Sequence, residues 1–323
     1  MELLRDSDIE MKPLAGKRVA ILGFGNQGRA QALNLKDSGV DVVVGLREGS
    51  GSTAVAEEAG LEVALVEDAA ASADIIMFLA PDEALAAIYK EVEARIRYGG
   101  AIGFSHGLTI HFDLIRPRHD LDVFLVAPKG PGSALRSLYE QGKGMVALWA
   151  VAQDASGSAT AISHAYGKAI GCARAGLIAS TFAEECEADL FNEGAVVWGA
   201  VPEILRAGFE TLVEAGVSPE VAFLECVGEL KLIAELIEQR GIAGMREAIS
   251  NTAELGAVLG GPQVVDDQVR QKMRTVLDEV RSGRFAEALR READEGYPRL
   301  EKARADARQH AIERVFSELK SLS

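Results

Sequence analysis

The sequence predicts an α/β domain, built on a doubly wound, Rossmann-type parallel sheet, followed by an all-α domain. Three observations support this fold class. Short apolar runs alternate with helical stretches, a glycine-rich loop follows the first run, and only helical periodicity continues beyond residue 181. We therefore place the two domains at residues 1–181 and 182–323.

Seven short runs are the candidate strands of the first domain. They are rich in Val, Ile, Leu and Phe and barely alternate with polar residues, which is typical of strands buried on both faces of a parallel sheet. The candidates are residues 18–22, 41–46, 61–64, 74–79, 101–105, 122–127 and 145–151.

The second domain is a series of predicted helices that end at proline or glycine. The helix expected over residues 220–239 is apolar nearly all round, so we expect it to be buried. The charged segment from Arg284 onward is either a solvated helix pair or a frayed tail. Breaks between helices are expected at Pro202, Gly216–Pro219, Gly241–Gly244 and Gly260–Pro262.

Composition excludes several classes of partner. The 323 residues are 48% hydrophobic, and 34 basic against 49 acidic residues give a net charge of −15. So acidic a chain is a poor non-specific ligand for nucleic acid or an anionic membrane. No apolar run is long enough to span a bilayer, and the N-terminus lacks a signal-peptide pattern. Three widely spaced cysteines, Cys172, Cys186 and Cys226, suit a reducing compartment. We expect a soluble, cytoplasmic protein.

The strongest local motif is RVAILGFGNQG at residues 18–28, where an apolar strand runs into three glycines and a helix follows. Gly23 allows a tight turn, Gly25 lets the backbone approach a pyrophosphate, and Gly28 permits close packing of helix on strand. Free N–H groups at the helix N-terminus favour phosphate. The predicted dinucleotide-binding residues of this loop are Gly23, Phe24, Gly25, Asn26, Gln27 and Gly28.

The end of the next strand indicates which dinucleotide binds. Arg47, Ser50 and Ser52 form a set that suits a phosphate, so NADPH is favoured. Glu48 in the same loop keeps NADH open, because an acid at this place can bond the ribose hydroxyls. In the alternative interpretation, Ser50 and Ser52 only cap the next helix.

Further polar residues follow predicted strands. His106 in FSHG, Lys129 in APKGPG, and Pro81 and Asp82 in LAPDE come after strands, as the glycine-rich loop does. All would lie at the carboxyl edge of the sheet, where open α/β folds bind ligands. We take His106 and Lys129 as candidate catalytic residues, and Pro81 and Asp82 as candidate cofactor-binding residues.

The second domain carries carboxylates at helical spacing. Glu185, Asp189 and Glu193 form one i,i+4 stripe, and Glu225 with Glu229 forms another on the apolar helix. Facing each other, they would form an oxygen-rich site for Mg²⁺ or Mn²⁺, with room for two ions. The alternative is that they are exposed stripes of an acidic protein.

Taken together, these segments resemble ketol-acid reductoisomerase in its short, class I form. The matching segments span nearly the whole chain and include GFGNQG, FSHGLTIHF, APKGPG, DLFNE, ECVGELKLI and GIAGMREAISNTAELG. The resemblance implies Mg²⁺-dependent alkyl migration and NADPH reduction of 2-acetolactate, or 2-aceto-2-hydroxybutyrate, in branched-chain amino-acid biosynthesis. It also implies a knotted helical domain interleaved between subunits, and therefore a homodimer or a higher even oligomer.

The resemblance also implies roles for single residues. Asp189 and Glu193 match Mg²⁺ ligands of one subunit, and Glu225 and Glu229 match acidic residues that face them from the other, beside the second ion. Ser250 matches a substrate-binding serine. The residues that match polar groups of the active site are His106, Lys129 and Glu185.

Two other function classes stay open at this point. A metal-free NAD(P)-dependent 2-keto acid, 3-hydroxyacid or imine reductase would share the two-domain outline, and a non-catalytic protein would bind NADP without turnover. Asn192, Gly194 and Trp198 depart from the family's pattern next to the metal-binding helix, so a paralogue with another substrate is a further alternative. The intact carboxylates favour the metal-dependent enzyme.

Overall fold

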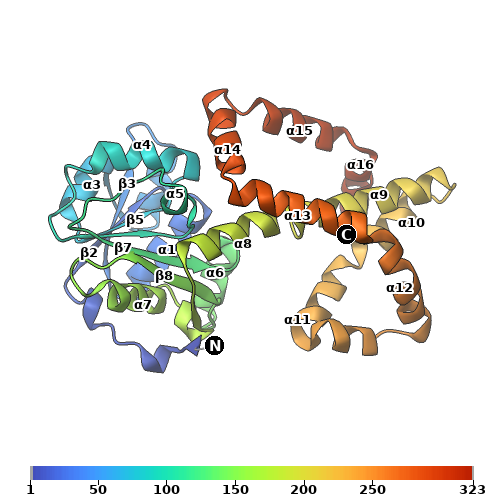
Figure 1. Cartoon of the computed structure of the whole chain (residues 1–323), viewed down its shortest axis with the longest axis horizontal. Coiled ribbons are helices and arrows are strands. Elements are labelled where there is room, and N and C mark those ends of the chain that lie inside the picture. Colours follow the sequence, from blue (N-terminus) through green and yellow to red (C-terminus); the bar gives the residue numbers. More distant parts are fainter. Residues whose placement is uncertain (1–2, 322–323) are drawn as a thin grey trace. The chain divides into compact units, whose positions relative to one another are not determined.

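The structure is a computed structural model that describes residues 3–321 (Figure 1). The chain forms two compact units, the first through Ala188 and the second from Asp189. Helix α8 (Phe182–Ala195) begins at the boundary expected from the sequence and contributes residues to both units.

Within residues 3–321, nine strands form one sheet in the order β1-β9-β8-β7-β6-β5-β2-β3-β4. The pairing from β4 across to β7 is parallel throughout, which confirms the doubly wound α/β fold. The strands are β1 (Leu3–Leu4), β2 (Arg18–Leu22), β3 (Asp41–Leu46), β4 (Glu62–Leu65), β5 (Ile75–Phe78), β6 (Ala101–Phe104), β7 (Asp122–Pro128), β8 (Ala147–Gln153) and β9 (Leu177–Ala179).

The sheet is not parallel at its other end. Strand β8 runs antiparallel to β7, and β1 runs antiparallel to β9. Pro128 at the end of β7 pairs with Ala147 at the start of β8, so the intervening helix α6 (Gly132–Glu140) returns the chain to the edge that it left. A parallel strand would have required a crossover to the opposite edge.

Both faces of the sheet are buried, as the apolar runs predict. Successive residues of β2 enter opposite cores, with Val19 on one side and Ala20 on the other. The first core is covered by α1 (Asn26–Asp37), α6 and α7 (Ala159–Ala169), and the second by α3 (Val66–Ser72) and α4 (Asp82–Val92). Two short helices, α2 (Thr53–Glu58) and α5 (Leu108–His111), follow β3 and β6.

The second unit is helical in its described part, as expected. Its α-helices are α9 (Ala200–Glu214), α10 (Pro219–Phe223), α11 (Leu230–Glu247), α12 (Asn251–Val264), α13 (Asp267–Arg281), α14 (Arg284–Asp294), α15 (Pro298–Gln309) and α16 (Ala311–Lys320). The break expected at Gly260–Pro262 is wrong, because α12 continues through it to Val264 with Pro262 in its last turn. The final segment is not a frayed tail, because Val315 of α16 is buried against Phe209 and Ala222.

The helix expected over residues 220–239 differs from its prediction in two ways. A π-helical turn, Leu224–Gly228, separates α10 from α11. The apolar side chains are also largely exposed within one chain, with Leu232 exposed by 59% and Leu224 by 52%. Exposed apolar side chains that lie together in this way mark an interaction surface.

No helix in residues 3–321 combines the length and the apolar character needed to cross a membrane.

Candidate functional site

The glycine-rich loop joins β2 to α1 and leaves space above the helix N-terminus. Gly23 has φ of 103°, and a Cβ there would lie 2.6 Å from the Ala80 backbone nitrogen. A Cβ at Gly25 would meet no atom within 4 Å, and Gly25 is the N-cap of α1. The open space beside Gly25 and the N–H groups of the first turn of α1 fit a pyrophosphate.

Three loop residues have roles that the motif alone does not indicate. The side chain of Phe24 is buried in the sheet core. Asn26 Oδ1 accepts from the Ser133 amide at 2.9 Å, and Gln27 Nε2 donates to the Gly130 carbonyl at 2.8 Å. The loop after β7, which carries Lys129, is therefore held against the nucleotide loop.

A chain of buried polar groups continues from Gln27 into the first unit. Gln31 Nε2 donates to Gln27 Oε1 at 3.1 Å and to Ser105 Oγ at 2.9 Å. Gln31 Oε1 accepts from the hydroxyl of Tyr166 at 2.7 Å, and both side chains are fully buried. This network joins α1, α7 and the end of β6, and sequence reasoning missed it because Gln31 and Tyr166 are far apart in the chain.

The loop after β3 exposes the residues expected to choose the cofactor. Arg47 and Glu48 are both exposed, and Gly49 follows with φ of 71°. The Ser52 amide donates to Ser50 Oγ at 3.3 Å. Ser52 is the N-cap of α2 but its hydroxyl makes no capping bond, so the capping interpretation does not account for it.

The carboxyl ends of β5, β6 and β7 bring together the candidate catalytic residues. Glu185, whose side chain is only 1% exposed, accepts from Lys129 Nζ and from the Gly107 amide, each at 2.8 Å. His106 Nδ1 lies 2.8 Å from Asp82 Oδ2. The structure thus assembles His106, Lys129, Glu185 and Asp82 at one edge of the sheet.

Helix α8 approaches this edge unusually closely. A Cβ at Gly107 would lie 2.2 Å from the Phe182 carbonyl oxygen and 3.1 Å from Cys186 Cβ, so only glycine fits there. Sequence reasoning noted the FSHG motif for its histidine and missed this glycine.

Charge around His106 changes its titration. Burial lowers the pKa of the imidazole, but the hydrogen bonds to Asp82 and Cys186 and the negative charges of Asp82 and Glu185 outweigh it and raise the pKa well above its usual value. Burial raises the pKa of the Cys186 thiol, which therefore stays protonated at neutral pH.

The proposed metal ligands occupy two places in the second unit. Asp189 is half-buried and Glu193 exposed on consecutive turns of α8, whereas Glu225 and Glu229 are exposed in and just after the π-helical turn. Among residues 3–321, one chain brings no three His, Cys, Asp or Glu side chains into a group able to hold a metal. Their carboxylates are ligands of the kind that Mg²⁺ prefers, but the described part of one chain does not gather them into a site.

Two other predicted residues have local structural positions. Ser250 is the N-cap of α12, where its hydroxyl accepts from the Ala253 amide at 3.2 Å. Pro81 is the exposed N-cap of α4.

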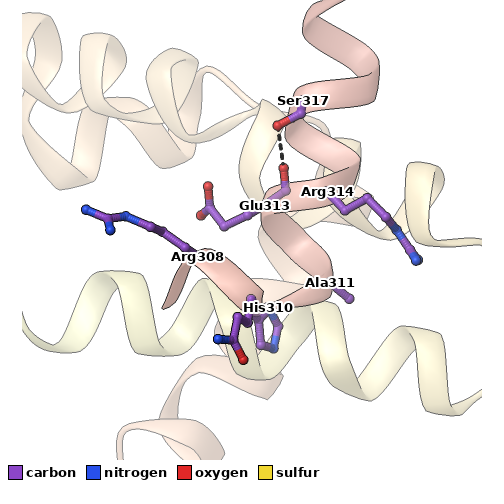
Figure 2. Close-up of a pocket in the computed structure, with 7 residues that line it drawn as sticks. Arg308, His310, Ala311, Glu313, Arg314 and Ser317 are labelled. Atoms are coloured by element: carbon purple, nitrogen blue, oxygen red, sulfur yellow. Dashed lines mark hydrogen bonds between the residues drawn. The ribbon is translucent and has the colours of Figure 1, made fainter. Parts of the chain in front are cut away.

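A cavity of about 310 Å³ lies where α15 meets α16 (Figure 2). Its lining includes Arg308, Glu313 and Arg314, and Ser317 Oγ donates to the Glu313 carbonyl at 2.9 Å. His310 caps α16 there and also contacts Glu210 at 3.0 Å. The Ser317 hydrogen bond and the His310 cap belong to α16 itself, and within residues 3–321 nothing in this cavity connects it with the sheet edge that carries His106 and Lys129.

The chain matches known proteins over its whole length. Residues 13–176 match the model of the acetohydroxy acid isomeroreductase NADPH-binding domain, and residues 182–323 match that of the ketol-acid reductoisomerase C-terminal domain. An NADH-preferring ketol-acid reductoisomerase from an uncultured archean is 42% identical, with 100% of this chain and 99% of that chain covered and a TM-score of 0.97. A semialdehyde dehydrogenase NAD-binding protein from Cupriavidus necator is 18% identical, with coverages of 82% and 99% and a TM-score of 0.62, which indicates the fold alone.

The buried network predicts a stability effect at Tyr166. Tyr166→Phe removes the donor to Gln31 Oε1 and leaves that buried oxygen unsatisfied, so the free energy of unfolding should fall by about 1–3 kcal/mol. Urea denaturation measures the change. Tyr98→Phe is the matched control, because Tyr98 is 82% exposed and its variant should unfold as the unaltered protein does. Equal midpoints for all three proteins would contradict the network's contribution.

Proposed function

This chain belongs to the ketol-acid reductoisomerase family, an NAD(P)-dependent oxidoreductase family, and we propose that it converts 2-acetolactate or 2-aceto-2-hydroxybutyrate to the 2,3-dihydroxy acid. The reaction would be an alkyl migration followed by reduction, in branched-chain amino-acid biosynthesis. The observation that carries this proposal is the Lys129–Glu185 pair at the sheet edge. It joins the loop beside the nucleotide site to the helix that bears Asp189 and Glu193.

The residues of this chain would bind the substrate and move protons. Lys129 Nζ, at 32% side-chain exposure, reaches solvent while Glu185 holds it, so it can give a proton to a developing alkoxide and regain one from water. When bound, two Mg²⁺ ions would polarise the hydroxyl and carbonyl oxygens of the substrate, and the nicotinamide would supply hydride. Ser250 would contact the substrate in addition to capping α12.

We further propose that the metal site is shared between two copies of the chain. Asp189 and Glu193 of one copy would face Glu225 and Glu229 of the other, in line with the incomplete ligand set of one chain within residues 3–321. The exposed apolar side chains of α11 supply the surface that a second copy would cover.

We place the enzyme in the cytoplasm. The described cysteines, Cys172, Cys186 and Cys226, are all free, which suits a reducing compartment.

The carboxylates of α8 provide the test of the reaction and of its metal. Unaltered protein should oxidise NADPH with 2-acetolactate only when Mg²⁺ is present. Asp189→Asn and Glu193→Gln should each lower that turnover by at least about 100-fold, beyond the loss typical of groups that only support metal ligands. Their NADPH affinity, followed by fluorescence, should not change, because the dinucleotide loop belongs to the first unit.

Glu184→Gln is the control, since Glu184 is an exposed acid on the same helix outside the stripe. Near-normal Mg²⁺-dependent turnover in either of the two variants, Asp189→Asn or Glu193→Gln, would show that the altered residue is not a metal ligand. Turnover without metal would favour the metal-free reductase.

Cofactor preference should follow the loop after β3. We propose NADPH over NADH, because Arg47, Ser50 and Ser52 suit the 2′-phosphate. Replacing both serines with Asp should repel that phosphate and reverse the preference, measured as kcat/KM for the two cofactors. A lower KM for NADH in the unaltered protein would instead give Glu48 control of the loop. The archaeal relative is described as NADH-preferring, so both cofactors are measured.

Assembly should depend on the apolar face of α11. Light scattering of the unaltered protein should give at least twice the mass of one chain. Leu232→Asp should shift the protein toward monomer and reduce turnover, because it would place a charge in the proposed interface. Tyr98→Asp, at an exposed site of the first unit, should leave assembly unchanged. An active monomer at micromolar concentration would rule out the shared site.

A further inference from the structure

His106 is held from two sides by groups of different elements. Asp82, the first residue of α4, contacts ring atom Nδ1 at 2.8 Å. Cys186, from the second turn of α8, lies beside the same ring. The side chains of His106 and Asp82 are 17% and 27% exposed, so this contact is well shielded from water.

We propose that Asp82 is a positioning residue for His106, not a ligand of the cofactor. This assignment rests on the proposed function for its role in turnover. The hydrogen bond between Asp82 and His106 lies within the first unit and does not depend on the proposed function.

The chemistry of the contact determines the state of the ring. A carboxylate only accepts hydrogen bonds, so Nδ1 must carry the proton that is shared with Asp82. The orientation of the ring is then fixed. The side of the ring away from Asp82 is next to Cys186 and Glu185 of α8. The ionisable groups that face His106 are Asp82 from α4 and Cys186 and Glu185 from α8, with Lys129 behind Glu185.

Electrostatics disfavours a contact between the Asp82 carboxylate and the cofactor pyrophosphate. The loop that contains Ala80 packs against Gly23, so Asp82 lies close to the nucleotide loop in the chain's fold. A carboxylate directed at a pyrophosphate would repel it. The hydrogen bond to His106 Nδ1 instead directs the carboxylate of Asp82 toward the histidine.

The test compares Asp82→Asn, Asp82→Glu and the control Glu91→Gln, which removes an exposed acid from the same helix. Three quantities are measured: the NADPH dissociation constant, the titration midpoint of His106 by ¹³C-histidine NMR, and kcat with 2-acetolactate and Mg²⁺. The chain has five histidines, and His106→Gln identifies the signal.

In Asp82→Asn the His106 midpoint should fall by about one pH unit or more, since the carboxylate that favours the imidazolium is lost. The NADPH dissociation constant should stay within about twofold, and kcat should fall by about tenfold or more because the candidate catalytic imidazole of His106 is misplaced. Asp82→Glu should keep a raised midpoint and recover part of kcat. The control should match the unaltered protein in all three measurements.

An NADPH dissociation constant raised about tenfold with an unchanged His106 midpoint would overturn the proposal and make Asp82 a cofactor ligand. A lowered midpoint with unchanged kcat would overturn the role in turnover. If Asp82→Asn does not fold, Asp82→Glu decides, because a midpoint that falls to the usual histidine value would contradict the proposed carboxylate contact. Absence of turnover in the unaltered protein would refute the proposed function, while cofactor affinity and the histidine midpoint would still decide how Asp82 acts.

Discussion

The buried carboxylate of Glu185 is the constraint on which the arrangement of the first unit depends. An ionised carboxylate at 1% exposure costs several kcal/mol unless its oxygens are paired. One oxygen is paired with the Lys129 ammonium and the other with the Gly107 amide, so the start of α8 is fixed to the ends of β6 and β7.

A second constraint is the coupling of loops beneath the glycine-rich turn. Gln27 holds the Gly130 carbonyl, and Gln31 links Gln27 to Ser105, the residue before His106. Buried polar networks of this kind are stable only when every member is satisfied, and here Tyr166 supplies the last donor. The nucleotide loop, Lys129 and His106 are thereby held by one set of hydrogen bonds, which is the preorganisation that hydride and proton transfer both require.

Sequence patterns predicted the parts of the fold that rest on local chemistry. The β2 and β3 boundaries, residues 18–22 and 41–46, agree with the structure because apolar runs and glycine turns define them. Strand β8 was expected to be parallel, since a buried strand has the same composition in either direction and only pairing reveals it. Strands β1 and β9, of two and three residues, are too short for any periodicity.

Sequence motifs could identify single residues of the candidate site, but not the contacts between them. His106 and Lys129 were found because both follow strands, but spacing cannot show which carboxylate pairs with which cation. Glu185 belongs by periodicity to the stripe with Asp189, whereas its burial assigns it to Lys129. Asp82 was grouped with the cofactor-binding residues because it follows a strand at the same edge of the sheet, and the structure adds its contact with His106.

The apolar segment around Glu225 and Glu229 shows why burial cannot be inferred from hydrophobicity within one chain. Leu224, Leu232 and Ile233 are apolar on several faces of the segment, and all are exposed by more than a third. Carboxylates next to such a surface would lose water when the surface is covered, and that loss is compensated only if cations arrive with the cover. A second copy that brings its own pair of carboxylates raises the negative charge further, so assembly and divalent-cation binding would have to stabilise each other.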